Sequence, residues 1–317
     1  MVNVVVLGVA TSAGAHHAGQ DRAPDALRGA GLLDRLGAAG VSVVDRGDVS
    51  VAPFAVDHDH PTRRNLDAVV RVARDVADAV ADVVAGGGVP LVLGGDCTIT
   101  LGVVAGVQRS LPDVGLFYFD GDADLATPAT TSSGVLDAMG VAHLLGLADS
   151  DLARLGATTP MLADERLVLV GYNEGDPETF REQVLRERPR LARFPDRAVR
   201  ADPTGTAKAA LSGPRTASDG LIVHFDVDAV DSGDLPLGNF PHYGTGVTLD
   251  QAGLVLTVAA AAPGLAAVVL TEVNPSYDPT GHQLERYVET VAAALGAGLG
   301  EARATGGEPH RPGPSTG

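Results

Sequence analysis

Acidic residues recur in four short stretches of the sequence, and each stretch directly follows a run of apolar residues. The four stretches are Gly94-Gly95-Asp96-Cys97-Thr98, Asp120-Gly121-Asp122-Ala123-Asp124, Asp226-Val227-Asp228 and Thr271-Glu272-Val273-Asn274-Pro275. If the apolar runs are parallel strands, these side chains meet at the carboxyl edge of one sheet, where open parallel sheets bind ligands. A lone DxDxD motif is typical of a solvated turn, but three further acidic strand ends favour a shared site.

Carboxylates gathered at one edge of a sheet repel one another. Two unit charges about 4 Å apart repel by about 4 kcal/mol at an effective dielectric constant of about 20. Protons, arginines or divalent cations must relieve this repulsion. Carboxylate oxygens together with the Cys97 sulfur suit a transition metal better than calcium, and Asp120 to Asp124 do not continue as an EF-hand loop. The sequence therefore predicts a metal site.

Short β-branched runs alternate with longer stretches of helical period, which is typical of parallel βαβ units. Strands are predicted at residues 2–7, 41–45, 89–93, 115–119, 167–170, near 197–200, 221–225 and 266–270. These runs are continuously apolar, so helices should cover both faces of the sheet. We predict an α/β fold, a three-layer αβα sandwich with a mostly parallel sheet of about eight strands.

Helices are predicted between these strands, at residues 23–36, 65–84, 99–108, 178–187, 249–261 and 283–295. Pro24 suits a first helical turn, because its missing N–H has no partner there in any case. Residues 186–220 are polar and rich in Pro, Arg and Gly, and they are predicted to form a surface excursion with a short strand and helix.

Length and composition are those of a globular protein. The chain has 317 residues, of which 45% are hydrophobic and 20% are charged. Because no repeat or Gly/Ser linker divides it, we predict one domain over residues 1–302 and a disordered Pro/Gly-rich tail over residues 303–317. The formal net charge is −17, whereas proteins that bind nucleic acids or anionic membranes usually carry a basic surface. The sequence therefore predicts neither nucleic acid nor membrane as a partner.

The sequence also predicts a cytoplasmic protein. The single cysteine cannot form an internal disulfide bond. The first residues lack a basic start and their apolar run is short, so they are interpreted as a strand rather than a signal peptide. No window of 18 uninterrupted apolar residues is present, so no membrane-spanning helix is expected.

The acidic motifs resemble those of the arginase/agmatinase (ureohydrolase) family, over about nine-tenths of the chain. GGDCT at residues 94–98 stands where the family has GGDHS, and FDGDADLATPATTSSG at 119–134 is similar to FDAHxDxNTPxTTSSG. HFDVDAVD at 224–231 is similar to SFDVDxxDP, and TEVNP at 271–275 contains the family's EVNP. The resemblance implies an arginase-like fold and a binuclear manganese hydrolase that cleaves guanidino groups to urea and an amine.

The resemblance also assigns roles to individual residues. It implies carboxylate ligands to the metal at four positions, with the first and third in bridging places: Asp120, Asp124, Asp226 and Asp228. Glu272 falls on the acid that binds the substrate guanidinium. Ser133 and Asp176 fall near positions that hold the amino-acid end of the substrate. Because members of the family are commonly trimers or hexamers, a homo-oligomer is expected.

The departures from the family pattern concern the ligands and the substrate pocket. Cys97 and Asp122 stand where the family has its two metal-binding histidines. Asp137 stands where many arginases have a histidine that shuttles protons. Ala126 and Val135 replace polar residues that recognise an α-amino-acid substrate.

These replacements change the charge of the predicted site. Two dications bring four positive charges, whereas five carboxylates and a thiolate bring six negative ones. A reduced site with one ion, held by Asp120, Asp124, Asp226 and Cys97, is therefore an alternative to two ions. His224 lies two residues before Asp226 on the same strand face, and it is either a core histidine or a second-layer partner of the site. The soft sulfur of Cys97 favours zinc or iron over the manganese that the resemblance implies.

The expected function is a metal-dependent hydrolase acting on a guanidino compound. The metal activates water, Glu272 holds the guanidinium, and Asp137 or Asp228 protonates the leaving amine. An aspartic acid donor suits a weakly basic leaving group, which favours an N-hydroxyguanidine such as N-hydroxyarginine and release of urea or hydroxyurea. Two alternatives stay open: an inert binding or partner subunit with this fold, and catalysis by Cys97 as a nucleophile.

Overall fold

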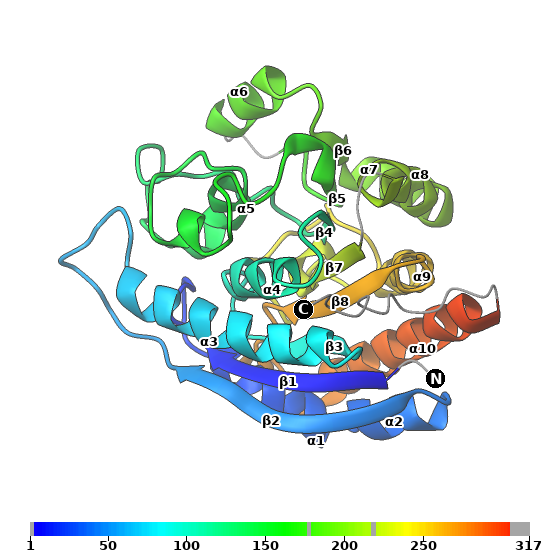
Figure 1. Cartoon of the computed structure of the whole chain (residues 1–317). Helices are drawn as coiled ribbons and strands as arrows, with labels where there is room; N and C mark the ends of the chain where they lie inside the picture. The colour runs from blue at the N-terminus through cyan, green and yellow to red at the C-terminus, as the bar shows by residue number, and fades with distance from the viewer. Residues whose placement is uncertain (1–2, 176–178, 217–219, 305–317) are drawn as a thin grey trace, which may run out of the picture.

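Eight parallel strands form a single sheet in the computed structural model, which describes residues 3–175, 179–216 and 220–304. Their order across the sheet is β2-β1-β3-β8-β7-β4-β5-β6 (Figure 1). The strands are β1 (Asn3–Thr11), β2 (Ser42–Ala52), β3 (Val89–Leu93), β4 (Val114–Phe119), β5 (Leu167–Val170), β6 (Ala192–Phe194), β7 (Gly220–Asp226) and β8 (Leu265–Thr271). The predicted three-layer α/β fold is confirmed.

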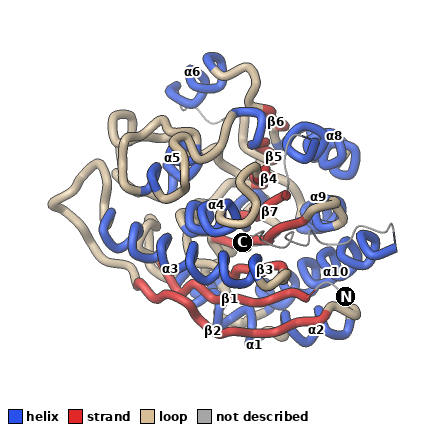
Figure 2. Tube along the Cα trace, viewed as in Figure 1, coloured by secondary structure: helices blue, strands red, loops and turns tan. Residues whose placement is uncertain are grey.

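Helices cover both faces of the sheet (Figure 2). They are α1 (Ala23–Gly29), α2 (Leu32–Ala38), α3 (Leu66–Ala85), α4 (Ile99–Gln108), α5 (Gly140–Leu144), α6 (Thr179–Glu187), α7 (Asp196–Ala201), α8 (Pro203–Thr216), α9 (Leu249–Ala260) and α10 (His282–Ala304). Successive strand residues point to opposite faces, so Val4 and Val6 pack with α1, α2 and α10, while Val5 and Leu7 pack with α3 and α4. No helix among the described residues is long and apolar enough to cross a bilayer.

One predicted strand is wrong. The segment near residues 197–200 belongs to helix α7, and the edge strand β6 lies just before it. Pro195 separates the two elements, and an i,i+4 ion pair of 3.0 Å between Asp196 and Arg200 supports the helix. Val199 is fully buried on the inner side of that helix. The segment for which the sequence predicted a weak strand is therefore a short helix with Val199 buried and an ion pair along one side.

Several other boundaries differ from the predictions. β1 and β2 extend to Thr11 and Ala52, beyond the strands expected over residues 2–7 and 41–45. The helix expected over residues 23–36 is divided into α1 and α2, because Gly31 adopts a left-handed conformation with φ of 84°. α10 extends to Ala304, so the predicted tail begins in its last turn, and the rest of that tail, residues 305–317, lies outside the described residues.

The strand order brings the four acidic motifs together. β3, β8, β7 and β4 are consecutive neighbours in the middle of the sheet, and all four point the same way. Their carboxyl ends therefore lie side by side, which is where parallel sheets bind ligands. The central position also means that helices cover the site's supporting strands on both faces.

Helix α4 begins immediately after the motif that contains Cys97, and its glycines let it lie close to α3. A Cβ atom at Gly102 would overlap the carbonyl oxygen of Ala73. A Cβ atom at Gly106 would lie 2.6 Å from the carbonyl oxygen of Ala77. Because backbone rather than a flexible side chain occupies this space, a larger residue forces the two helices apart.

We therefore expect Gly102→Ala to lower the free energy of unfolding by about 1–3 kcal/mol, through overpacking against α3. Gly37→Ala in α2 is the control, because no atom lies within 4 Å of the added Cβ. That variant should stabilise the protein by about 0.5–1 kcal/mol, the usual gain over glycine in a helix. Urea denaturation measures both changes, and equal effects of the two substitutions would contradict the packing argument.

Candidate metal centre

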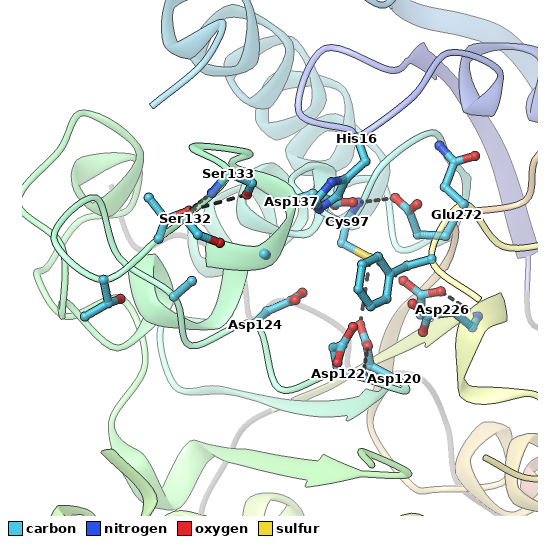
Figure 3. A pocket seen from close by; sticks show the side chains of 17 residues that line it. His16, Cys97, Asp120, Asp122, Asp124, Ser132, Ser133, Asp137, Asp226 and Glu272 are labelled. Carbon is cyan, nitrogen blue, oxygen red and sulfur yellow. Dashed lines mark hydrogen bonds between the residues drawn. The ribbon is translucent and has the colours of Figure 1, made fainter. Parts of the chain in front are cut away.

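A pocket at the carboxyl edge of the sheet is lined by nine of the residues singled out from the sequence (Figure 3). They are Cys97, Asp120, Asp122, Asp124, Ser133, Asp137, Asp226, Asp228 and Glu272. His224 is fully buried beneath this pocket and contacts its floor. Asp176 lies outside the described residues, so its predicted contact with the substrate stays a prediction.

The deepest group of candidate ligands consists of Cys97, Asp120, His224 and Asp226, which we call the inner set. One ligand atom from each lies within 4.8 Å of all the others. The Cys97 Sγ lies 2.7 Å from Asp226 Oδ2 and 3.8 Å from Asp120 Oδ2. A cation between these atoms would meet a sulfur, a nitrogen and two oxygens, the mixed donor set that suits zinc or iron.

Strand register places His224 in the inner set. It is paired with Tyr118 on β4, whose ring stacks on the imidazole at a centroid distance of 4.1 Å. Thr100 Oγ1 lies 2.8 Å from Nδ1, whereas Nε2 lies 3.6 Å from both Cys97 Sγ and Asp120 Oδ2. Burial lowers the pKa of His224 to about 3, so the ring is neutral and can offer a lone pair to a metal.

A second group consists of Asp122, Asp228 and His242, which we call the outer set. Their ligand atoms also lie within 4.8 Å of one another. His242 Nε2 is 3.5 Å from Asp122 Oδ2 and 3.9 Å from Asp228 Oδ2. Sequence reasoning missed His242, because it lies in the aperiodic loop between β7 and α9 and outside every acidic motif. Its flanking residues, PHYGTG, indicate a turn and carry no signal of metal binding.

Backbone amides hold the acidic side chains in place. Asp120 Oδ1 accepts a hydrogen bond of 2.6 Å from the N–H of Asp122, and Asp226 Oδ1 accepts one of 2.7 Å from the N–H of Asp228. Asp228 Oδ1 in turn accepts one of 3.0 Å from the N–H of Gly121, which links β7 to β4. Each carboxylate thus has one oxygen fixed by the backbone and a second oxygen that is available to the pocket.

Two of the pocket carboxylates lie on residues with left-handed backbone conformations. The φ angle is 47° at Asp124 and 63° at Glu272. Such values are uncommon for residues with a Cβ atom and cluster at functional sites. The Tyr118 hydroxyl donates to Asp124 Oδ2, which holds that carboxylate against the pocket wall.

Glu272 and Asp137 face each other beside the backbone of Cys97 (Figure 3). The backbone N–H of Cys97 lies 2.7 Å from Asp137 Oδ1 and 3.2 Å from Glu272 Oε1, and it donates to both. Gln20 Nε2 donates a hydrogen bond of 2.8 Å to the second oxygen of Glu272. These contacts aim two carboxyl groups at one region of the pocket, where they can bind a planar cation.

Burial and mutual repulsion raise the pKa of the pocket carboxyl groups. Desolvation is the largest cause throughout, and neighbouring carboxylates add to it. The pKa of Asp228 rises to about 6 and that of Glu272 to about 8, while those of Asp120, Asp226 and Asp137 also lie well above the usual range. This pocket therefore disfavours its own negative charge unless a cation enters it.

The same environment raises the pKa of the Cys97 thiol. Burial is the main cause, and four surrounding carboxyl groups contribute. A nucleophilic cysteine needs a lowered pKa, which helix N-termini or basic neighbours supply. The site therefore offers poor support for Cys97 as an attacking thiolate.

The donor set fits bound divalent cations. Seven carboxyl groups line the pocket, and none of its described lining residues is a lysine or an arginine. Protein cations therefore do not neutralise this charge from within the pocket. The inner and outer sets each combine carboxylates with one imidazole, which is a suitable ligand group for a transition metal.

Comparisons with known proteins agree on the relationship of this chain. The model of the arginase family matches residues 2–297. The arginase of Brevibacillus brevis is 32% identical, over 92% of this chain and 96% of that protein. The native structure of arginase from Bacillus caldovelox has a TM-score of 0.81 at 28% identity, covering 95% of this chain and 99% of that one.

A second solved structure is similar to this chain over the same range. The crystal structure of arginase from Bacillus cereus has a TM-score of 0.80 at 27% identity, and it covers 94% of this chain and 98% of that chain. The match thus extends over the whole sheet and includes all four acidic motifs. The chain belongs to the arginase family.

Proposed function

We propose that the protein is a metal-dependent hydrolase that cleaves a C–N bond of a guanidino compound and releases urea or hydroxyurea and an amine. The observation that carries this proposal is the convergence of seven carboxyl groups on one pocket whose described lining contains no lysine or arginine, with the imidazoles of His224 and His242 beside these acids. The relatives whose names are "Arginase" support the choice of a guanidino group.

A guanidinium is planar and cationic, and the pocket provides a matching surface. Glu272 and Asp137 present carboxyl oxygens from one side, and Gln20 fixes the far oxygen of Glu272. Contact between the Glu272 carboxylate and a guanidinium gives strong, charge-assisted hydrogen bonds, with Asp137 beside it. Burial and neighbouring carboxyl groups raise the pKa of Glu272, and a bound cationic substrate would favour its charged form.

We assign the metal to the inner and outer sets, with one or two ions per chain. A bound divalent cation supplies Lewis acidity, which activates water and polarises an electrophilic carbon. By the family resemblance, Asp120 and Asp226 lie in bridging places, with Asp124 as a further ligand. His224 supplies the inner set with an imidazole nitrogen, in the place where Cys97 has replaced a histidine. The Cys97 sulfur favours zinc or iron there over manganese.

Asp137 is the residue that we propose as the proton donor to the leaving amine. Burial and the neighbouring Glu272 raise its pKa well above the usual range, which favours the protonated form of this carboxyl group. Asp228 is the alternative donor. A weakly basic leaving group departs with less help from a proton donor than an alkylamine needs. An N-hydroxyguanidine, such as N-hydroxyarginine, meets this condition when its hydroxylamine nitrogen leaves, which yields hydroxylamine and a substituted urea; release of hydroxyurea instead expels the alkylamine, which Asp137 must protonate.

The far end of the pocket would hold the rest of the substrate. Ser133 lines that end, with the other small hydroxyl side chains of the loop after β4. Ala126 also lines the pocket and offers no hydrogen bond to an α-amino group. We therefore propose weaker recognition of the amino-acid end than a polar residue at this place would give.

We expect Glu272→Gln to raise KM for the guanidino substrate about 10- to 100-fold, because the change removes the charge from two charge-assisted hydrogen bonds. A panel of guanidines and N-hydroxyguanidines, assayed for urea and hydroxyurea, identifies the substrate and measures the loss. Glu289→Gln on the exposed side of α10 is the matched control and should leave KM unchanged. No product from any member of the panel, with metal bound, would support the inert binding subunit instead.

Metal removal should make stability depend on pH. Asp228 and Glu272 have folded-state pKa values of about 6 and 8, above the values of 3.8 and 4.5 that such groups have in an unfolded chain. The unfolded chain therefore releases these protons first, and the stability of the metal-free protein falls from about pH 4 to pH 8. For Asp228 alone, full loss corresponds to about 3 kcal/mol.

Thermal unfolding of chelator-treated protein across this pH range measures the effect, at constant ionic strength. Asp228→Asn should flatten the profile, because it removes one of the titrating groups. Saturating zinc or manganese should raise the melting temperature most at pH 8, where the ligands are deprotonated. A metal-free protein that is more stable at pH 8 than at pH 5 would contradict the assignment.

A further inference from the structure

We propose that His242 completes a second metal site with Asp122 and Asp228, and so replaces from a distant loop the histidine that the end of β4 lacks. This inference rests on the proposed function and deepens it, since it gives the outer set its own ion. Two residues of this chain stand where the family has its metal-binding histidines. Each of them lies in a ligand set with a histidine from another part of the chain. Cys97 shares the inner set with His224, and Asp122 shares the outer set with His242.

The geometry of the outer set suits a small cation. The His242 Nε2 atom lies 3.5 Å from one oxygen of Asp122 and 3.9 Å from one oxygen of Asp228, so one ion can contact all three after small side-chain movements. Ligand atoms that surround a metal at about 2.0–2.2 Å are themselves roughly 3–4 Å apart. His242 is only 7% exposed, so its ring is held in the protein rather than in solvent.

The loop that carries His242 is fixed at several points. The N–H of His242 donates to Ser232 Oγ at 3.0 Å, and the N–H of Ser232 donates to the carbonyl of His242 at 2.7 Å. Val230 pairs with Val247 in a parallel bridge that closes the base of the loop. Phe240 packs edge-on against the imidazole at a centroid distance of 5.5 Å. These contacts direct the ring toward Asp122 and Asp228.

Charge favours the same assignment. Two carboxylates and a neutral imidazole carry a charge of −2, which one divalent cation balances. Three protein ligands also leave coordination positions open, as in catalytic metal sites. The inner set contains a sulfur and the outer set contains none, so the two sites differ in softness. The outer site should therefore accept manganese more readily than the inner site.

Cobalt titration of the metal-free full chain separates the two sites. Co²⁺ bound to the Cys97 sulfur gives a thiolate-to-metal charge-transfer band in the near ultraviolet, and Co²⁺ in the outer site gives only weaker visible bands. We expect two equivalents per chain in the unaltered protein, one of which produces the charge-transfer band. His242→Ala should keep that band and lose the other equivalent, with affinity at least about 100-fold lower. Isothermal titration calorimetry and plasma mass spectrometry count the ions.

Two further variants test the position of the histidine. Tyr243→Ala changes the adjacent residue, which is 70% exposed, and it should keep both equivalents. Asp122→His in the His242→Ala background returns an imidazole to the end of β4 and should restore the second equivalent. Recovery in this double variant shows that the loss came from a missing ligand and not from a misfolded loop, and circular dichroism confirms that each variant is folded.

The outcomes distinguish this inference from the proposed function. Retention of two equivalents at unchanged affinity in His242→Ala would overturn the role of His242. Binding of one ion per chain, unaffected by His242→Ala, would also overturn it but would leave a one-metal hydrolase intact. Failure of the unaltered protein to bind any Co²⁺, Mn²⁺ or Zn²⁺ would overturn both proposals.

Discussion

Repulsion among buried carboxylates is the interaction on which the rest of this structure depends. Parallel strands end at one edge, so a protein that places acids after β4, β7 and β8 must bring them within a few ångströms of one another. Burial makes this arrangement more costly, as the raised pKa values of Asp226 and Glu272 indicate. Backbone amides fix the acids in position, but they do not cancel the charge. The fold therefore builds a cavity whose electrostatics are completed only by a bound cation or by protons.

Neutral nitrogen ligands are the second requirement of such a cavity, because they hold a metal without adding negative charge. In this chain the two imidazoles come from the interior of β7 and from the loop before α9. Their environments differ. His224 is stacked on Tyr118 and fully buried, whereas His242 packs edge-on against Phe240, which lines the pocket. Each set of acids thus has one histidine nitrogen beside it, although these histidines stand at other positions than the family's histidine ligands.

The sheet and most of the pocket could be predicted from the sequence, because both follow from local patterns. Continuous apolar runs predict buried parallel strands, and an acid after such a run must lie at the carboxyl edge. Other features depend on long-range pairing. The stacking of Tyr118 on His224 requires β4 and β7 to be neighbours in a particular register. His242 reaches the site through a loop without periodicity, and α7 replaces a strand expected near residues 197–200.

The left-handed backbone at Asp124 and Glu272 has a consequence for the stability of this molecule. A residue with a Cβ atom loses of the order of 1–3 kcal/mol in such a conformation, whereas glycine loses much less. Glycine at either place would therefore relieve backbone strain, but it would also remove a carboxyl group from the pocket. The main chain thus carries a conformational cost at two of the positions that give this cavity its negative charge.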